Sequence, residues 1–184
     1  MQVLGIPGSL RMASYNRGLL RAAQELAPDG MEIRVFGLND IPLYDADVEA
    51  DGDPAPVVAF KDAIRAADGL LIATPEYNRG IPGVLKNALD WASRPPFGSP
   101  LTNKHVAVMG ASTGMSGTAK AQEQVRQTLS FPRAQVLETC VRVPEAYMRF
   151  DNEGRLVDEV ARAALRGLLE ELAAVVEPAE RALA

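Results

Sequence analysis

The stretch that decides the fold is "GLLIATP", residues 69–75, an unbroken apolar run between a glycine and a proline. A strand with one face in solvent would alternate apolar and polar side chains, and this run does not alternate. Continuous apolar strands are typical of the middle of a parallel sheet, where helices cover both faces. The stretch therefore predicts a central strand of a parallel α/β sheet.

The segments on both sides of this run alternate between strand-like and helix-like patterns. Strand-like segments are residues 2–6, 31–38, 105–112 and 134–143, and helix-like segments are residues 15–27, 56–67, 83–93, 118–130 and 156–177. Five strands and five helices in this order predict a doubly wound, three-layer sandwich with right-handed crossovers. For a chain of this length we expect the flavodoxin-like strand order 2-1-3-4-5. The polar residues 44–56 are expected to form a surface connection.

The composition is that of an ordinary globular domain. The 184 residues are 47% hydrophobic and 23% charged, with a net charge of −5. This charge argues against a nucleic-acid partner and against a basic membrane anchor. No apolar run reaches the length that spans a bilayer. We therefore expect a single domain, residues 1–184, that binds neither nucleic acid nor membrane.

The rarest residue types narrow the chemistry further. The chain has one cysteine and one histidine, which exclude an internal disulfide and argue against a metal site. The first residues, "MQVLGIPGSLR", lack the charged region and the long apolar region of a secretory signal. We expect a cytoplasmic protein that holds no metal.

Three loops are expected at the ligand-binding edge of this sheet. In open α/β sheets, ligands bind at the carboxyl ends of the strands, where the strand order reverses. The loops at that point are "GSLRMASYN" (8–16), "TPEYNRGIPG" (74–83) and "GASTGMSG" (110–117). All three are rich in glycine, hydroxyl and amide groups, a chemistry that turning the chain does not require.

The first loop suggests an anion site. It contains neither the Gly-Lys-Ser/Thr of a P-loop nor the G-x-G-x-x-G of a dinucleotide fold. What it offers is two hydroxyls, a guanidinium and an amide before a helix N-terminus, a combination that suits a phosphate. These groups belong to Ser9, Arg11, Ser14 and Asn16. The alternative is that Ser14 only caps the helix and that Arg11 is solvated.

The second loop suggests a flat heterocycle. Pro75 and Pro82 stiffen it, and its glycines allow the backbone to approach a ligand closely. Tyr77 offers an aromatic face and Asn78 offers a donor and an acceptor. Turn chemistry before a helix would explain the prolines, but it would not explain the Tyr-Asn pair.

Together, the motifs "GSLRxxSxN", "PEYNxGxPGxLKNALDW" and "GASxGxxGTAxAQ" resemble those of the NADPH-dependent FMN reductase family, which includes quinone, chromate and azo-dye reductases. The resemblance covers roughly residues 4–145 and implies a flavodoxin-like fold. It implies that Ser9, Arg11, Ser14 and Asn16 hold the FMN phosphate, and Tyr15 is assigned to the cofactor site with them. Pro75, Glu76, Tyr77 and Asn78 would line the isoalloxazine ring and the ribityl chain. Ser112, Thr113 and Gly114 would close the site.

The resemblance also implies an activity. The chain would be an oxidoreductase that passes hydride from NADPH or NADH through FMN to a small-molecule electron acceptor in a ping-pong cycle. Quinones, azo dyes, metal oxyanions and free flavin are all possible acceptors, and no catalytic side chain is required. Members of the family are homodimers or homotetramers. Arg79 and Met115 depart from common members beside the ring site, so the acceptor does not carry over.

Three alternatives remain at the level of the sequence. One is a flavodoxin-type electron carrier without its own substrate, and another is an FMN reductase that supplies reduced flavin to a monooxygenase. The third is a phosphate-binding regulatory domain without flavin. Carriers tend to be acidic around the flavin, whereas Arg11, Arg79 and Lys86 lie in or near these loops. This basic character favours an enzyme that accepts anionic NAD(P)H.

Overall fold

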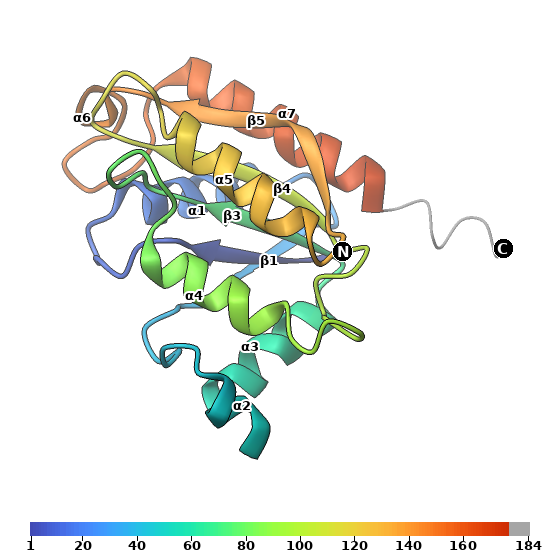
Figure 1. The fold of residues 1–184 in the computed structure, drawn as a ribbon. Helices are drawn as coiled ribbons and strands as arrows, with labels where there is room; N and C mark the ends of the chain where they lie inside the picture. Colours follow the sequence, from blue (N-terminus) through green and yellow to red (C-terminus); the bar gives the residue numbers. More distant parts are fainter. Residues whose placement is uncertain (177–184) are drawn as a thin grey trace, which may run out of the picture.

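The sheet has the predicted architecture. The computed structural model describes residues 1–176, and its five strands are parallel in the order β2-β1-β3-β4-β5 (Figure 1). The strands are β1 (Gln2–Pro7), β2 (Glu32–Val35), β3 (Gly69–Ala73), β4 (His105–Ala111) and β5 (Gln135–Val143). This is the flavodoxin-like order expected from the sequence.

Two layers of helices enclose the sheet (Figure 1). The helices are α1 (Tyr15–Leu26), α2 (Ala46–Asp51), α3 (Ala55–Ala66), α4 (Gly83–Ala92), α5 (Ala119–Ser130), α6 (Ala146–Arg149) and α7 (Glu159–Val176). Apolar residues of α1 and α7 form a core on one face of the sheet, and those of α3, α4 and α5 form a core on the other. Within residues 1–176, no helix is both long and apolar enough to cross a membrane.

The burial of the central strand, β3, explains its continuous apolar sequence. β3 pairs with β1 on one side and with β4 on the other, and every residue of it is buried. Leu71 and Ala73 belong to the core beneath α1 and α7, whereas Leu70 and Ile72 belong to the opposite core. Successive side chains of a strand point to opposite faces. Because both faces are covered, the run has to be apolar throughout.

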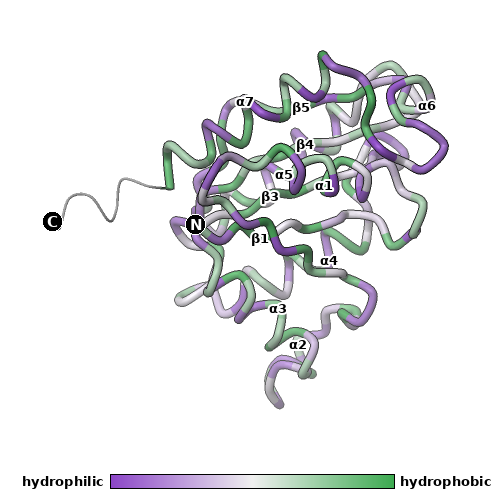
Figure 2. Tube along the Cα trace, turned by 180° about the vertical axis from the view of Figure 1, so that it is seen from behind, coloured by the Kyte–Doolittle hydropathy of each residue, from purple (hydrophilic) through white to green (hydrophobic). Residues whose placement is uncertain are grey.

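Two short helices differ from the expectation. Residues 44–56 contain α2, where only a connection was expected, and α6 follows β5. Asp45 caps α2 by accepting a hydrogen bond from the backbone N–H of Asp47. No residue of α2 is buried, so no apolar period could reveal it. The turn after α6 is also strongly hydrophilic (Figure 2).

Some boundaries differ as well. β2 is shorter than the expected residues 31–38, and α7 begins three residues later than the expected start at residue 156. Residue 177, the expected last residue of that helix, lies outside the described residues, as does the rest of the expected domain to residue 184.

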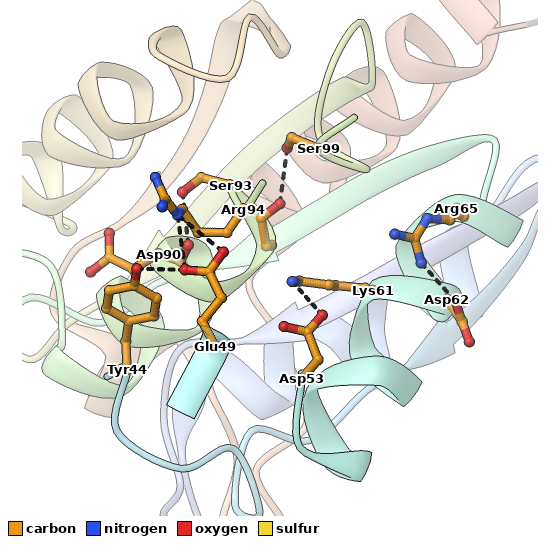
Figure 3. Close-up of polar contacts among 11 residues, drawn as sticks. Tyr44, Glu49, Asp53, Lys61, Asp62, Arg65, Asp90, Ser93, Arg94 and Ser99 are labelled. Atoms are coloured by element: carbon orange, nitrogen blue, oxygen red, sulfur yellow. Dashed lines mark hydrogen bonds and ion pairs between the residues drawn. The ribbon is translucent and has the colours of Figure 1, made fainter. Parts of the chain in front are cut away.

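The segment around α2 is hydrogen-bonded to α4 and to Arg94, which follows α4. The carbonyl oxygen of Pro42 accepts hydrogen bonds from Trp91 Nε1 (2.9 Å) and from Asn87 Nδ2 (2.7 Å). Tyr44 Oη donates to Glu49 at 2.7 Å, and Arg94 Nε lies 3.1 Å from the same carboxylate (Figure 3). These bonds hold α4, which begins directly after the second loop.

Candidate functional site

The three loops meet at the carboxyl ends of β1, β3 and β4 (Figure 1). They line an open cavity of about 140 Å³. Its lining includes nine predicted site residues, namely Arg11, Ser14, Tyr15, Asn16, Pro75, Glu76, Tyr77, Ser112 and Thr113. Three predicted residues lie outside the lining: Ser9 is buried in the first loop, Asn78 is at the tip of a turn, and Gly114 is exposed. A ligand in the cavity would therefore touch all three loops.

The first loop has hydrogen-bond donors that find no acceptor within residues 1–176. Ser9 and Ser14 are only 4% and 5% exposed. Ser9 Oγ accepts the backbone N–H of Arg11 at 3.3 Å, and Ser14 Oγ caps α1 by accepting the N–H of Asn16 at 3.2 Å. Within residues 1–176 neither hydroxyl donates a hydrogen bond, and the Arg11 guanidinium has no hydrogen-bond or ion-pair partner.

This donor set fits the phosphate of FMN. A buried hydroxyl that donates to nothing is unfavourable unless a ligand or water accepts from it. Ser14 caps α1, where the helix dipole also favours an anion, and Ser9 and Arg11 belong to the loop that leads to this helix end.

Asn16 has a role that the sequence did not reveal. Its Nδ2 donates to the carbonyl oxygen of Ala111 at 2.9 Å, and its Oδ1 accepts the N–H of Ala111 at 2.9 Å. The side chain is buried and joins the first loop to the end of β4. One Nδ2 hydrogen remains for a ligand. Contact of Asn16 with a phosphate therefore stays a prediction. The hydrogen bonds of Asn16 to Ala111, 95 positions away in the sequence, give it an anchoring role.

The second loop is a tight turn that presents Tyr77. The N–H of Tyr77 donates to the Gly80 carbonyl at 3.1 Å, and the N–H of Gly80 donates back at 3.0 Å. Asn78 and Arg79, between them, have φ angles of +52° and +62°. The left-handed region suits asparagine and strains arginine. The turn leaves the Tyr77 side chain 56% exposed, which makes its ring available to a ligand.

The helix α5 holds the second loop at both ends. Near the start of the loop, the Glu76 carboxylate accepts the backbone N–H groups of Lys120 (2.8 Å) and Ala121 (3.2 Å), in the first turn of α5. At the other end, Gln124 Oε1 accepts the N–H of Ile81 at 2.9 Å. The sequence assigned Glu76 to the cofactor and gave no sign of these contacts.

The same helix also fixes the third loop. Gln122 is buried, and its Nε2 donates to Thr118 Oγ1 at 3.0 Å and to the Val141 carbonyl at 2.9 Å. Thr118 in turn lies against β4 at Gly110, where a Cβ atom would stand 1.9 Å from Thr118 Oγ1. Only glycine fits at that position. Gln122 was visible in the sequence as part of the third motif, but its partners were not.

Known proteins with similar sequences carry the names FMN reductase and quinone reductase. The model of the family described as NADPH-dependent FMN reductase matches residues 1–147. An NAD(P)H-dependent FMN reductase of Pseudomonas aeruginosa is 49% identical over 173 residues, which cover 94% of this chain and 93% of that protein. A quinone reductase of Pseudomonas putida is 40% identical over 177 residues, covering 94% of this chain and 92% of that protein.

A solved structure agrees. The flavoenzyme NAD(P)H:(acceptor) oxidoreductase FerB of Paracoccus denitrificans superposes with a TM-score of 0.86 at 33% identity, covering 96% of this chain and 97% of that one. The strand order, the arrangement of the three loops and these similarities lead to one assignment: the chain belongs to the NADPH-dependent FMN reductase family.

Proposed function

We propose that this chain is an FMN-dependent NAD(P)H oxidoreductase that reduces a small-molecule acceptor such as a quinone, an azo dye, a metal oxyanion or free flavin. The observation that carries the proposal is the set of unused donors in the first loop, beside a cavity that all three loops share. When bound, FMN would supply the redox chemistry, taking a hydride from NAD(P)H and reducing the acceptor in a ping-pong cycle. The names of the relatives support this activity.

In this proposal the first loop holds the phosphate. Ser9 and Ser14 donate their hydroxyl hydrogens, and Arg11 adds charge-assisted hydrogen bonds. Tyr15 and Asn16 line the cavity next to them. Since Ser14 also caps α1, its hydroxyl connects the phosphate to the start of the helix.

The other two loops hold the ring and the ribityl chain. Pro75, Glu76 and Tyr77 line the same cavity, with Asn78 next to them at the turn. Ser112, Thr113 and Gly114 close the site from the end of β4, where the backbone N–H groups of Thr113 and Gly114 can stabilise negative charge on the ring. The N–H of Ser112 is used within the protein, since it donates to the Val143 carbonyl at 3.1 Å. Arg79 and Met115 are exposed at the rim, and we assign them to the second substrate. A cation at position 79 suits the phosphates of NAD(P)H.

Three further properties complete the proposal. Residues 1–184 form a single FMN-binding domain, because all five strands belong to one sheet and all three loops serve one site. The enzyme is cytoplasmic, where NAD(P)H is supplied. It is a homodimer or homotetramer, which size-exclusion chromatography with light scattering tests directly.

The decisive experiment is the visible spectrum of the purified protein with added FMN, followed by anaerobic addition of NADPH. We expect a bound flavin band that bleaches when NADPH is added. A band that does not bleach with NADPH or NADH would make the protein an electron carrier instead. Absence of FMN binding would refute the cofactor assignment. Bleaching with flavin that then leaves the protein would favour supply of reduced flavin to a partner monooxygenase.

A further inference from the structure

The helix α5 begins without a cap of its own. Its N-cap residue, Thr118, has a φ angle of +69° and makes no capping hydrogen bond with its side chain. The first-turn N–H groups of Lys120 and Ala121 donate instead to Glu76, which comes from a loop more than 40 positions earlier. The carboxylate therefore takes the place that a capping side chain normally fills.

Glu76 also lacks a cationic partner. The backbone N–H of Lys120 donates to Glu76, but the Lys120 ammonium pairs with Glu123 at 2.9 Å. Within residues 1–176 no lysine or arginine forms an ion pair with Glu76. The positive charge that faces this carboxylate is the partial charge at the N-terminus of α5, about half an elementary charge for a helix.

This pair of charges lies at the proposed cofactor site. Glu76 lines the 140 Å³ cavity together with Tyr77 and Ser112. A helix N-terminus near a flavin stabilises the more negative, reduced form of the cofactor. A carboxylate seated on that N-terminus offsets this effect while it anchors the loop.

We propose that Glu76 is a positioning residue that balances the N-terminal charge of α5 and thereby sets the relative affinity of the site for oxidised and reduced FMN. The inference rests on the proposed function. Glu76 makes the site favour reduced FMN less than the bare helix end would, so that electrons pass more readily to the acceptor.

The test is Glu76→Gln, which keeps an oxygen acceptor for the two N–H groups and removes the charge. Affinity for oxidised FMN is measured by fluorescence titration, and the midpoint potential of bound FMN is measured anaerobically against a reference dye. Relative to the wild type, we expect the preference for reduced FMN to rise about tenfold, which corresponds to a potential about 30 mV less negative for a two-electron couple.

The matched control is Glu123→Gln, which removes the same charge from an exposed position on the same helix. We expect it to change the preference less than about twofold, because exposed charges are screened by solvent. Ser116→Asp makes the opposite change. The Ser116 hydroxyl is exposed and lies 3.5 Å from Glu76, so a carboxylate there should lower the preference for reduced FMN.

Equal potentials for Glu76→Gln and Glu123→Gln, or a shift toward oxidised FMN in Glu76→Gln, would overturn the inference. If Glu76→Gln does not fold, Ser116→Asp decides: an unchanged or less negative potential overturns the inference, and a more negative one supports it. Failure of the wild-type protein to bind FMN would be a different result, because it refutes the proposed function itself.

Discussion

Arg11 is the residue on which the proposed phosphate site depends most. It stands beside two buried hydroxyls, and its guanidinium has no partner within residues 1–176. Its type and spacing led to the prediction of an anion site from the sequence, and that site stays a prediction. The roles of Asn16 and Glu76 could not be predicted, because their partners lie 95 and about 44 positions away and only the fold brings them together.

Arg11→Ala should weaken FMN binding much more than it slows reduction of bound FMN. A hydrogen bond to a charged group contributes about 1.5–3 kcal/mol, so we expect the dissociation constant to rise about 10- to 100-fold. Fluorescence titration measures binding, and stopped-flow absorbance at saturating FMN measures reduction by NADPH. Arg65→Ala, at an exposed position on α3, is the control. A variant that retains FMN fully but is no longer reduced would contradict the assignment.

Gly110→Ala should destabilise the protein. The new Cβ atom would lie 1.9 Å from Thr118 Oγ1 and 2.5 Å from the Thr74 carbonyl oxygen, so the start of α5 or the backbone after β3 would have to shift. Overpacking of this kind costs about 1–3 kcal/mol of unfolding free energy, which urea denaturation measures.

The control for that substitution is Gly167→Ala. Gly167 lies within α7, where nothing stands within 4 Å of the added Cβ atom. Alanine should stabilise the helix there by about 0.5–1 kcal/mol. Equal effects of the two substitutions would show that the close contact at Gly110 does not matter.

At the scale of elements, periodicity decided what could be predicted. β3 and the longer helices carry apolar residues at the spacing of their buried faces, and the sequence located them within a few residues. α2 and α6 have four to six residues each, and α2 buries none of them. α2 is held instead by the contacts of Glu49 with Tyr44 and Arg94, and such polar contacts leave no period in the sequence.

The polar contacts of α2 predict a dependence of stability on pH. The hydrogen bond from Tyr44, and then the Arg94 guanidinium, hold the pKa of Glu49 below its ordinary value of 4.5, and the bond to Glu49 raises the pKa of Tyr44. The Glu49 contribution is therefore present above pH 4.5 and is lost as the pH falls through the lowered pKa. The Tyr44 contribution is present below its ordinary pKa of 10.0 and is lost as the pH rises through the raised pKa.

Glu49→Gln should accordingly be less stable than the wild type near neutral pH, and the difference should shrink in acid. Urea denaturation at about pH 7 and about pH 3 measures both values. Glu153→Gln, at an exposed position in the turn after α6, controls for the general effect of removing a carboxylate. A difference that stays constant between the two pH values would contradict the charged role of Glu49.

At the scale of the whole molecule, one side chain joins the two ends of the site. Asn16 lies in the first turn of α1, the helix that follows β1. It is hydrogen-bonded to Ala111 at the end of β4, which is separated from β1 by β3. The chain topology was predictable because right-handed crossovers leave few arrangements open. The hydrogen bonds between Asn16 and Ala111 were not predictable, since they depend on how closely α1 packs against the sheet.

Asn16→Ala should lower both stability and FMN affinity. The substitution leaves the buried N–H and carbonyl groups of Ala111 without the partners they now have, at about 1–3 kcal/mol for an unsatisfied buried group. Thermal and urea unfolding of the protein without FMN isolate the structural effect. Asn39→Ala, at an exposed position after β2, should leave both quantities unchanged. Unaltered stability of Asn16→Ala would refute the anchoring role.

Because two loops are attached to one helix, the site consists of a part that α5 holds in place and an exposed rim. Protein engineering can vary the rim. Glu76, Gln122 and Gln124 belong to the part that α5 holds, whereas the tips at Arg79 and Met115 are exposed. Under the proposed function, a library randomised at Met115 should change the choice of acceptor while the protein keeps its flavin. Fewer residue types fit at position 79, because its left-handed backbone is accessible without strain mainly to glycine, asparagine and aspartate.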